Sequence, residues 1–246
     1  MPMTVESHTL RHYRTLLDQL DPESVPRACL IHKAPCGINH PGKKLGILDA
    51  SFNPMTLAHT RMIEETCQTL GMDEMLLMLS RSNVDKEIFG ASLEQRLAML
   101  VGYASSHPYL SIAGCSHARF VDKVHSLKPL YPDNTAFYFI LGYDTLTRLF
   151  DPKYYMDMSA ELQALFDACQ FVAANRASFG APQMKAFMEK PECRAFADRV
   201  HFIQLEASYG NISSTQVRER RQNGASIADL VPLEIADQIK SMNLYL

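Results

Sequence analysis

From Leu45 onward, short apolar segments alternate with amphipathic ones, and this alternation constrains the fold more than any other feature. Segments that are apolar at nearly every position predict strands buried on both faces. Between them, apolar residues recur at helical spacing, as Leu93, Leu97 and Leu100 do. The pattern predicts an α/β fold, a Rossmann-like and mainly parallel sheet with helices on both faces. The expected strands are residues 45–48, 74–79, 109–113, 136–141, 171–174 and 200–205, and the clearest expected helices are 56–70, 92–105, 214–221 and 233–241.

The first 43 residues precede this alternation, so we expect an N-terminal helix-and-loop extension (1–43) and a main domain (44–246). Residues 4–20 predict an amphipathic helix, and 28–31 a short strand. Residues 33–44 contain two prolines and two glycines, which predicts a loop. The extension is expected to cover a sheet edge or to form an interface.

Composition excludes several classes of function. The net charge of −3 argues against a nucleic-acid partner, and no run of 18 apolar residues suggests a membrane span. No secretory signal is recognisable, and none of the six cysteines forms a C-x-x-C pair. Free thiols in a cytoplasmic protein, or a nuclear one in a eukaryote, are therefore expected.

A polar segment from Ser51 to His59 follows the strand at 45–48 and opens a helix. Pro54 stiffens the turn, and Thr56 is suited to cap the helix. His59 then falls in the first turn, where the positive end of the helix dipole favours an anion. A histidine there can donate a hydrogen bond to a phosphate, although a lone histidine in the protein core is the alternative.

A second polar segment, residues 212–218, opens another predicted helix. Ser213 precedes Gln216 by three residues, which is the spacing of a capping box. Arg218 would project back towards the start of the helix and add a cation beside its free N–H groups. A well-capped surface helix is the plain interpretation, and a second phosphate-binding helix start is the functional one.

Four further polar positions follow predicted strands, at the sheet edge where ligands of parallel sheets bind. Gly142 and Asp144 follow residues 136–141, with a capped turn as the alternative. The other two candidates are Lys86 and Arg176, and a guanidinium suits a phosphate well.

The two segments, in this order, resemble the signatures of the nicotinamide/nicotinate mononucleotide adenylyltransferase family. Ser51 to His59 is similar to the first signature, with Thr56 at the first of its two histidine positions. Residues 212–218 match the second signature, I-S-S-T-x-x-R. The resemblance spans about residues 44–246 and implies a nucleotidyltransferase domain. It also implies joining of the AMP moiety of ATP to a pyridine mononucleotide, with release of pyrophosphate.

The resemblance also implies roles for individual residues. His59 and Arg218 would be catalytic, and Mg²⁺ would be held mainly by phosphates rather than by a protein metal site. Ala50 replaces a usual glycine, and the chain has no tryptophan to stack on the pyridine ring, for which Tyr154 or Tyr155 could substitute. The ATP or phosphate ligands would be Ser51, Phe52, Thr56, Lys86, Gly142, Asp144, Ser213, Ser214 and Thr215, and the mononucleotide ligands Asn53, Tyr154, Tyr155 and Arg176.

Other functions remain open on the sequence. The acceptor could be flavin mononucleotide or phosphopantetheine, or the protein could be a non-catalytic nucleotide sensor or scaffold. The expected partners are small molecules, ATP and a mononucleotide, with a homo-oligomer possible. Preference between the nicotinamide and nicotinate nucleotides is not encoded in these motifs.

Overall fold

The structure is a computed structural model that describes residues 5–81, 90–175 and 180–246. Its centre is a seven-stranded sheet in the order β1-β4-β3-β2-β5-β6-β7. All neighbouring strands are parallel except β1, which pairs antiparallel with β4. The predicted fold class is therefore confirmed. The strands are β1 (Ala28–His32), β2 (Lys44–Asp49), β3 (Glu74–Ser80), β4 (Leu110–Cys115), β5 (Ala136–Gly142), β6 (Gln170–Ala174) and β7 (Val200–Ile203).

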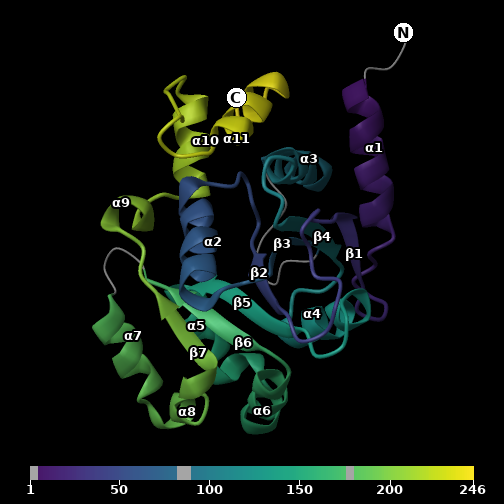
Figure 1. The fold of residues 1–246 in the computed structure, drawn as a ribbon. Coiled ribbons are helices and arrows are strands. Elements are labelled where there is room, and N and C mark those ends of the chain that lie inside the picture. Colours follow the sequence, from purple (N-terminus) through teal and green to yellow (C-terminus); the bar gives the residue numbers. More distant parts are fainter. Residues whose placement is uncertain (1–4, 82–89, 176–179) are drawn as a thin grey trace.

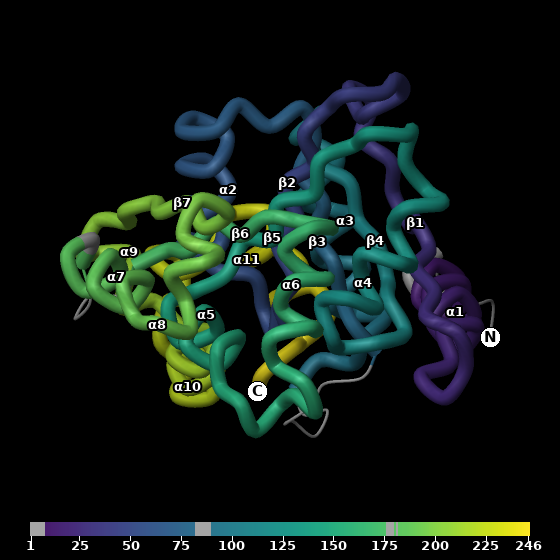
Figure 2. Tube along the Cα trace, turned by 90° about the horizontal axis from the view of Figure 1, so that it is seen from below, coloured from purple at the N-terminus to yellow at the C-terminus, as the bar shows by residue number. Residues whose placement is uncertain are grey.

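Helices cover both faces of this sheet (Figures 1 and 2). One face packs against α1 (Val5–Asp18), α2 (Leu57–Leu70), α3 (Leu93–Ala104), α9 (Ala207–Gly210), α10 (Ser214–Gln222) and α11 (Leu233–Ser241). The other packs against α4 (Phe120–Leu127), α5 (Tyr143–Leu149), α6 (Met158–Ala168), α7 (Ala181–Met188) and α8 (Pro191–Arg194). Three short 3-10 helices are η1 (Lys128–Leu130), η2 (Pro152–Tyr154) and η3 (Ala197–Arg199). No helix among these described elements is long and apolar enough to cross a membrane.

The sheet separates two apolar cores, because side chains along a strand alternate between its faces. In β2, Leu45 and Ile47 join the core on the α4 side, whereas Leu48 joins the core on the α2 side. All seven residues of β3 are buried, which is consistent with the apolar run from Met75 to Leu79.

Strand β2 lies at the centre of the sheet, with β3 on one side and β5 on the other. Ile47 is in register with Leu76 of β3 and with Phe139 of β5. The chain builds outward from β2 to β3 and β4, then returns and builds the other way from β5 to β7. The carboxyl ends of β2 and β5 thus mark the topological switch point of the sheet, the place where ligands of such sheets bind.

The N-terminal residues take part in the same sheet. Strand β1 extends the sheet at its edge, with Ala28 in register with Cys115. Helix α1 packs on α3, and an ion pair joins Arg14 to Glu94. The predicted amphipathic helix and short strand are confirmed, while the division between residues 43 and 44 stays a prediction about domain organisation.

Candidate active site

The first motif forms a turn between β2 and α2, and we call residues 51–56 the signature loop. Thr56 is the extended N-cap residue, and α2 begins at Leu57, as predicted. Phe52 has a φ of 42°, an uncommon value for a bulky side chain, and its ring is buried. Such a conformation persists only where surrounding contacts hold it in place.

His59 is oriented by the start of its own helix. The Thr56 backbone N–H donates to His59 Nδ1 at 3.0 Å, and the Thr56 hydroxyl lies 2.8 Å from the same nitrogen. Burial lowers the pKa of His59 to about 4, so the imidazole is neutral at pH 7. Because Nδ1 accepts, the proton of the neutral ring is on Nε2. His59 is therefore a neutral hydrogen-bond donor rather than an imidazolium.

Helix α10 docks directly on the signature loop. The Ser214 hydroxyl donates to the Pro54 carbonyl at 2.8 Å, and Arg218 donates to the Asn53 carbonyl at 2.7 Å. Arg218 also donates to Thr215 Oγ1 at 3.0 Å. Two segments separated by about 160 residues are thus in direct contact.

These contacts change how two predicted ligands can act. The proton of the Ser214 hydroxyl points to Pro54, so Ser214 would meet a phosphate through its backbone N–H. Thr215 Oγ1 accepts from Arg218, which leaves its own proton to donate, and the residue is exposed. Of the predicted capping box only one half forms: Ser213 Oγ accepts from the Gln216 N–H at 3.2 Å, while Gln216 Oε1 is buried without a partner.

Arg96 of α3 also supports the signature loop, although neither motif includes it. It is 3% exposed, and it donates to the Ser51 carbonyl at 3.2 Å and to the Ala91 carbonyl at 2.8 Å. Burial is the main cause that lowers the pKa of its guanidinium. Arg96 thus supports the signature loop from α3, and an arginine on the buried side of an amphipathic helix was the signal for it.

The Asn53 side chain is buried and forms hydrogen bonds within the protein rather than facing solvent. Its Oδ1 accepts from the Ala91 N–H at 3.2 Å and from the Tyr245 hydroxyl at 2.9 Å, and the residue is 4% exposed. Its predicted role in mononucleotide binding stays a prediction. Sequence reasoning missed Tyr245, because nothing local links a residue 192 positions downstream to this loop.

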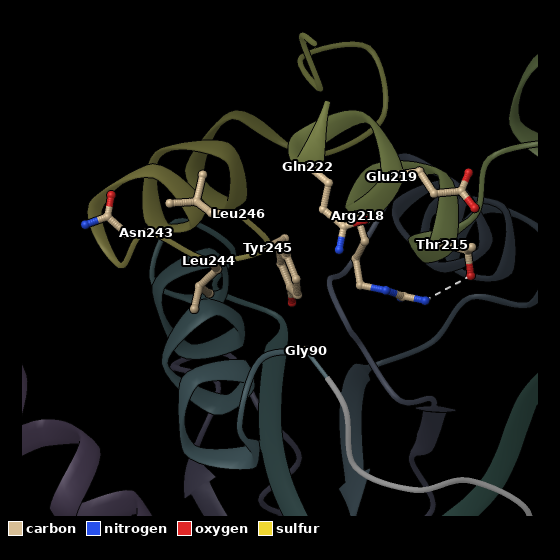
Figure 3. A pocket seen from close by; sticks show the side chains of 9 residues that line it. All are labelled: Gly90, Thr215, Arg218, Glu219, Gln222, Asn243, Leu244, Tyr245 and Leu246. Atoms are coloured by element: carbon tan, nitrogen blue, oxygen red, sulfur yellow. Dashed lines mark hydrogen bonds between the residues drawn. The ribbon is translucent and has the colours of Figure 1, made fainter. Parts of the chain in front are cut away.

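A cavity of about 550 Å³ opens beside these residues. Figure 3 shows Arg218 and Thr215 on one side and the Tyr245 ring pointing towards Gly90. The cavity borders the Arg218 guanidinium and the Thr215 hydroxyl, both supplied by the second motif. Its lining is Gly90, Thr215, Arg218, Glu219, Gln222, Asn243, Leu244, Tyr245 and Leu246.

The remaining predicted residues follow β5 or lie outside the described residues. Gly142 ends β5 and caps α5, a Cβ there would meet nothing within 4 Å, and Asp144 is exposed in the first turn of α5. Tyr154 is 39% exposed, whereas Tyr155 donates to the Leu149 carbonyl. Lys86 and Arg176 are outside the described residues, and their roles stay predictions.

A buried ion pair lies just before the signature loop. Lys123 of α4, 2% exposed, donates to Asp49 at 2.5 Å, and Ser80 donates to the same carboxylate at 3.0 Å. Asp49 is thereby committed to the protein itself. In the described part of the chain, no group of three or more His, Cys, Asp and Glu side chains could hold a metal ion.

Comparison with known proteins agrees with this architecture, that of an α/β nucleotidyltransferase. Residues 47–220 match the model of the cytidylyltransferase-like family, and the chain belongs to that family. The match includes both motifs and every strand from β3 to β7.

Two relatives are similar in sequence to most of the chain. A Dehalococcoides mccartyi protein provisionally named a nicotinate-nucleotide adenylyltransferase is 30% identical over 82% of this chain and 97% of its own. A Schizosaccharomyces pombe protein provisionally named a nicotinamide mononucleotide adenylyltransferase is 29% identical, over 82% and 86%. The fold is shared with the Plasmodium falciparum nicotinic acid mononucleotide adenylyltransferase complexed with APC, with a TM-score of 0.62 and 17% identity, over 82% of this chain and 97% of that one. The family resemblance drawn from the two motifs is confirmed.

Proposed function

We propose that this protein is an adenylyltransferase that joins the AMP moiety of ATP to nicotinamide or nicotinate mononucleotide. The observation that supports the proposal most is the docking of Ser214 and Arg218 on the signature loop, because it brings the start of α10 against the loop that precedes α2 and His59. The names of the two relatives support a pyridine mononucleotide as the acceptor.

The reaction is an in-line displacement at the α-phosphorus of ATP. A phosphate oxygen of the mononucleotide forms the new P–O bond, and the bond to the β-phosphate breaks and releases pyrophosphate. The attacking oxygen is already anionic near neutral pH, so no strong base is needed. Catalysis then consists of positioning and of stabilising developing charge.

Each residue has a definite part in this scheme. His59 donates through Nε2–H to the α-phosphate and, being neutral, loses no proton on binding. Arg218 carries five donors, so it can hold Asn53 and a β- or γ-phosphate together. Thr215 donates through its hydroxyl, and the backbone N–H groups at the start of α10 complete the anion site.

Mg²⁺ would arrive with ATP and be bound mainly by phosphate oxygens. Asp49, the carboxylate at the end of β2, is paired with Lys123 and is therefore not offered as a ligand for the ion. The ion supplies charge neutralisation on the triphosphate. Arg218 and Lys86 are the protein cations proposed to act beside it.

The acceptor would lie beyond Gly142, on the α5 side of the switch point. Tyr154 is 39% exposed and can present its ring to the pyridine, with Lys153 Nζ lying 4.8 Å from the centroid of that ring. The six free cysteines support a cytoplasmic or nuclear location. A homo-oligomer stays a prediction.

The test is turnover of Mg-ATP with nicotinamide mononucleotide and nicotinate mononucleotide in parallel, measured as pyrophosphate release with the dinucleotide confirmed by mass. We expect turnover with at least one of them. Turnover only with flavin mononucleotide or phosphopantetheine would show that the acceptor is not a pyridine mononucleotide. ATP binding without turnover on any acceptor would contradict the proposal that the protein is an adenylyltransferase.

His59→Asn tests the mechanism more sharply than His59→Ala. An asparagine can still accept from the Thr56 N–H and cap the helix, yet it lacks a donor at the Nε2 position. We expect kcat to fall by at least about 100-fold, the usual cost of losing a preorganised donor. The melting temperature of His59→Asn should stay close to that of the wild type, and near-normal turnover would refute the role of His59.

A further inference from the structure

We propose that Tyr245 is a positioning residue for catalysis, which holds the signature loop in its active shape through Asn53. This inference rests on the proposed function. Tyr245 is distant from both motifs in sequence, yet its hydroxyl donates to Asn53 Oδ1 at 2.9 Å. Asn53 lies in the middle of the signature loop, which leads into helix α2 and His59.

The contact is built into the fold rather than made by a mobile side chain. Tyr245 is 8% exposed, and its backbone adopts a φ of 59°, a value that non-glycine residues rarely take. Asn243 has a φ of 50°, and the Leu244 N–H donates to the Ile239 carbonyl at 3.0 Å. These turns reverse the chain after α11 and direct the Tyr245 ring inward (Figure 3).

The direction of the hydrogen bond follows from chemistry. Asn53 Oδ1 can only accept, so the phenol must donate. Burial raises the pKa of Tyr245, while Arg96 and Arg218 act in the opposite direction by a smaller amount. The phenol therefore keeps its proton across the range in which the enzyme would work.

Residues from three separate segments of the chain form hydrogen bonds with Asn53. Arg218 of α10 binds its carbonyl at 2.7 Å, the Ala91 N–H binds its side chain at 3.2 Å, and Tyr245 binds the same side-chain oxygen. The neighbouring Phe52 has a left-handed backbone that needs such support. Tyr245 also lines the cavity that contains Arg218, so one ring both contacts the signature loop and forms part of the cavity wall.

Tyr245→Phe isolates the hydrogen bond, because the ring keeps its packing and Asn53 keeps the Ala91 donor. We expect kcat to fall about fivefold to tenfold, the worth of one hydrogen bond and a slightly misplaced reacting group. KM for ATP should stay within about twofold, because the contacts of Arg218 and Thr215 are unchanged. Amide hydrogen exchange of residues 51–56 should become faster.

Tyr131→Phe is the matched control. Tyr131 is 6% exposed, and its hydroxyl donates to Glu74 at 2.7 Å at the opposite, amino-terminal edge of the sheet. We expect a lower melting temperature for it, with kcat and exchange in the signature loop unchanged. The control shows what a purely structural tyrosine hydroxyl does.

The outcomes separate this inference from the proposed function. Absence of turnover by the wild type refutes the function, and amide exchange in residues 51–56 then still decides whether Tyr245 holds the loop. Unchanged loop exchange in Tyr245→Phe overturns the inference. So does a Tyr245→Phe enzyme that matches Tyr131→Phe, with a lower melting temperature and normal kcat.

Discussion

At the residue scale, the start of α2 determines what His59 can do. A backbone N–H must donate, so its bond to Nδ1 leaves Nε2 to carry the proton of the neutral ring. Phe52, with its ring centroid 5.3 Å from that of His59, helps to exclude water and disfavours the charged form. The Thr56 N–H and the Phe52 ring, both part of this turn, thus favour the neutral form of His59, which can donate a hydrogen bond to a phosphate.

The lowered pKa of His59 predicts a dependence of stability on pH. The pKa is about 4 in the folded protein against 6.5 for an ordinary histidine, so at intermediate pH only the unfolded chain binds the proton. The free energy of unfolding should therefore fall as pH drops from about 6.5 towards about 4. Urea unfolding at several pH values across this range measures this dependence. The free energy of unfolding of His59→Asn should fall less steeply with decreasing pH than that of the wild type. A His59 ring that titrates near 6.5 by NMR would contradict this.

At the element scale, the segment before α3 approaches the signature loop closely at Gly90. This residue has a φ of 76°, and a Cβ would lie 2.9 Å from Asn53 Oδ1 and 3.1 Å from Tyr245 Cε1. Glycine is needed here both for its backbone conformation and for the space. This close approach allows the Ala91 N–H and the Tyr245 hydroxyl both to donate to Asn53 Oδ1.

Gly90→Ala should therefore reduce both stability and turnover. Gly42 is its natural control, because its φ is 78° and nothing lies within 4 Å of its missing Cβ. We expect Gly42→Ala to cost about 1 kcal/mol in unfolding free energy through backbone strain alone, with normal kcat. Gly90→Ala should cost about 1 kcal/mol more through crowding and should lower kcat. Equal effects of the two substitutions, by chemical denaturation and kinetics, would show that the contact with Asn53 is unimportant.

At the scale of the whole molecule, the ion pair of Lys123 and Asp49 joins a helix of one face to the end of the central strand. Its two side chains are 2% and 19% exposed, and Lys123 also donates to the Ala118 carbonyl. Removing one partner of such a pair leaves a charge in a poorly solvated place. The pair thus holds α4 against the strand that leads into the site.

Lys123→Met is expected to lower the unfolding free energy by about 3 kcal/mol, because Asp49 loses its cation. Adding Asp49→Leu should recover about half of that loss or more, since no buried charge then remains. Lys43→Met, which breaks the half-exposed pair with Asp73, should cost less than about 1 kcal/mol. Urea denaturation of the four proteins measures this, and a double variant less stable than Lys123→Met would refute the explanation.

The strand–helix order and the two helix starts could be predicted from the amino-acid sequence, because these features depend on local patterns. Apolar runs predicted β3 and β5, and Thr56 and Ser213 marked the caps of α2 and α10 within one residue. Such features need only the periodicity of side chains and the free N–H groups of a first turn.

Which side chains are in contact could not be predicted without the folded structure. Tyr245 and Arg96 reach the signature loop from 192 and 45 residues away, and the hydroxyl of Ser214 turned to Pro54 instead of outward. The antiparallel pairing of β1 likewise depends on an open sheet edge that no local pattern describes. Contacts of this kind depend on how distant elements pack, so a local pattern can mark a residue such as Arg96 as buried but cannot specify its partner.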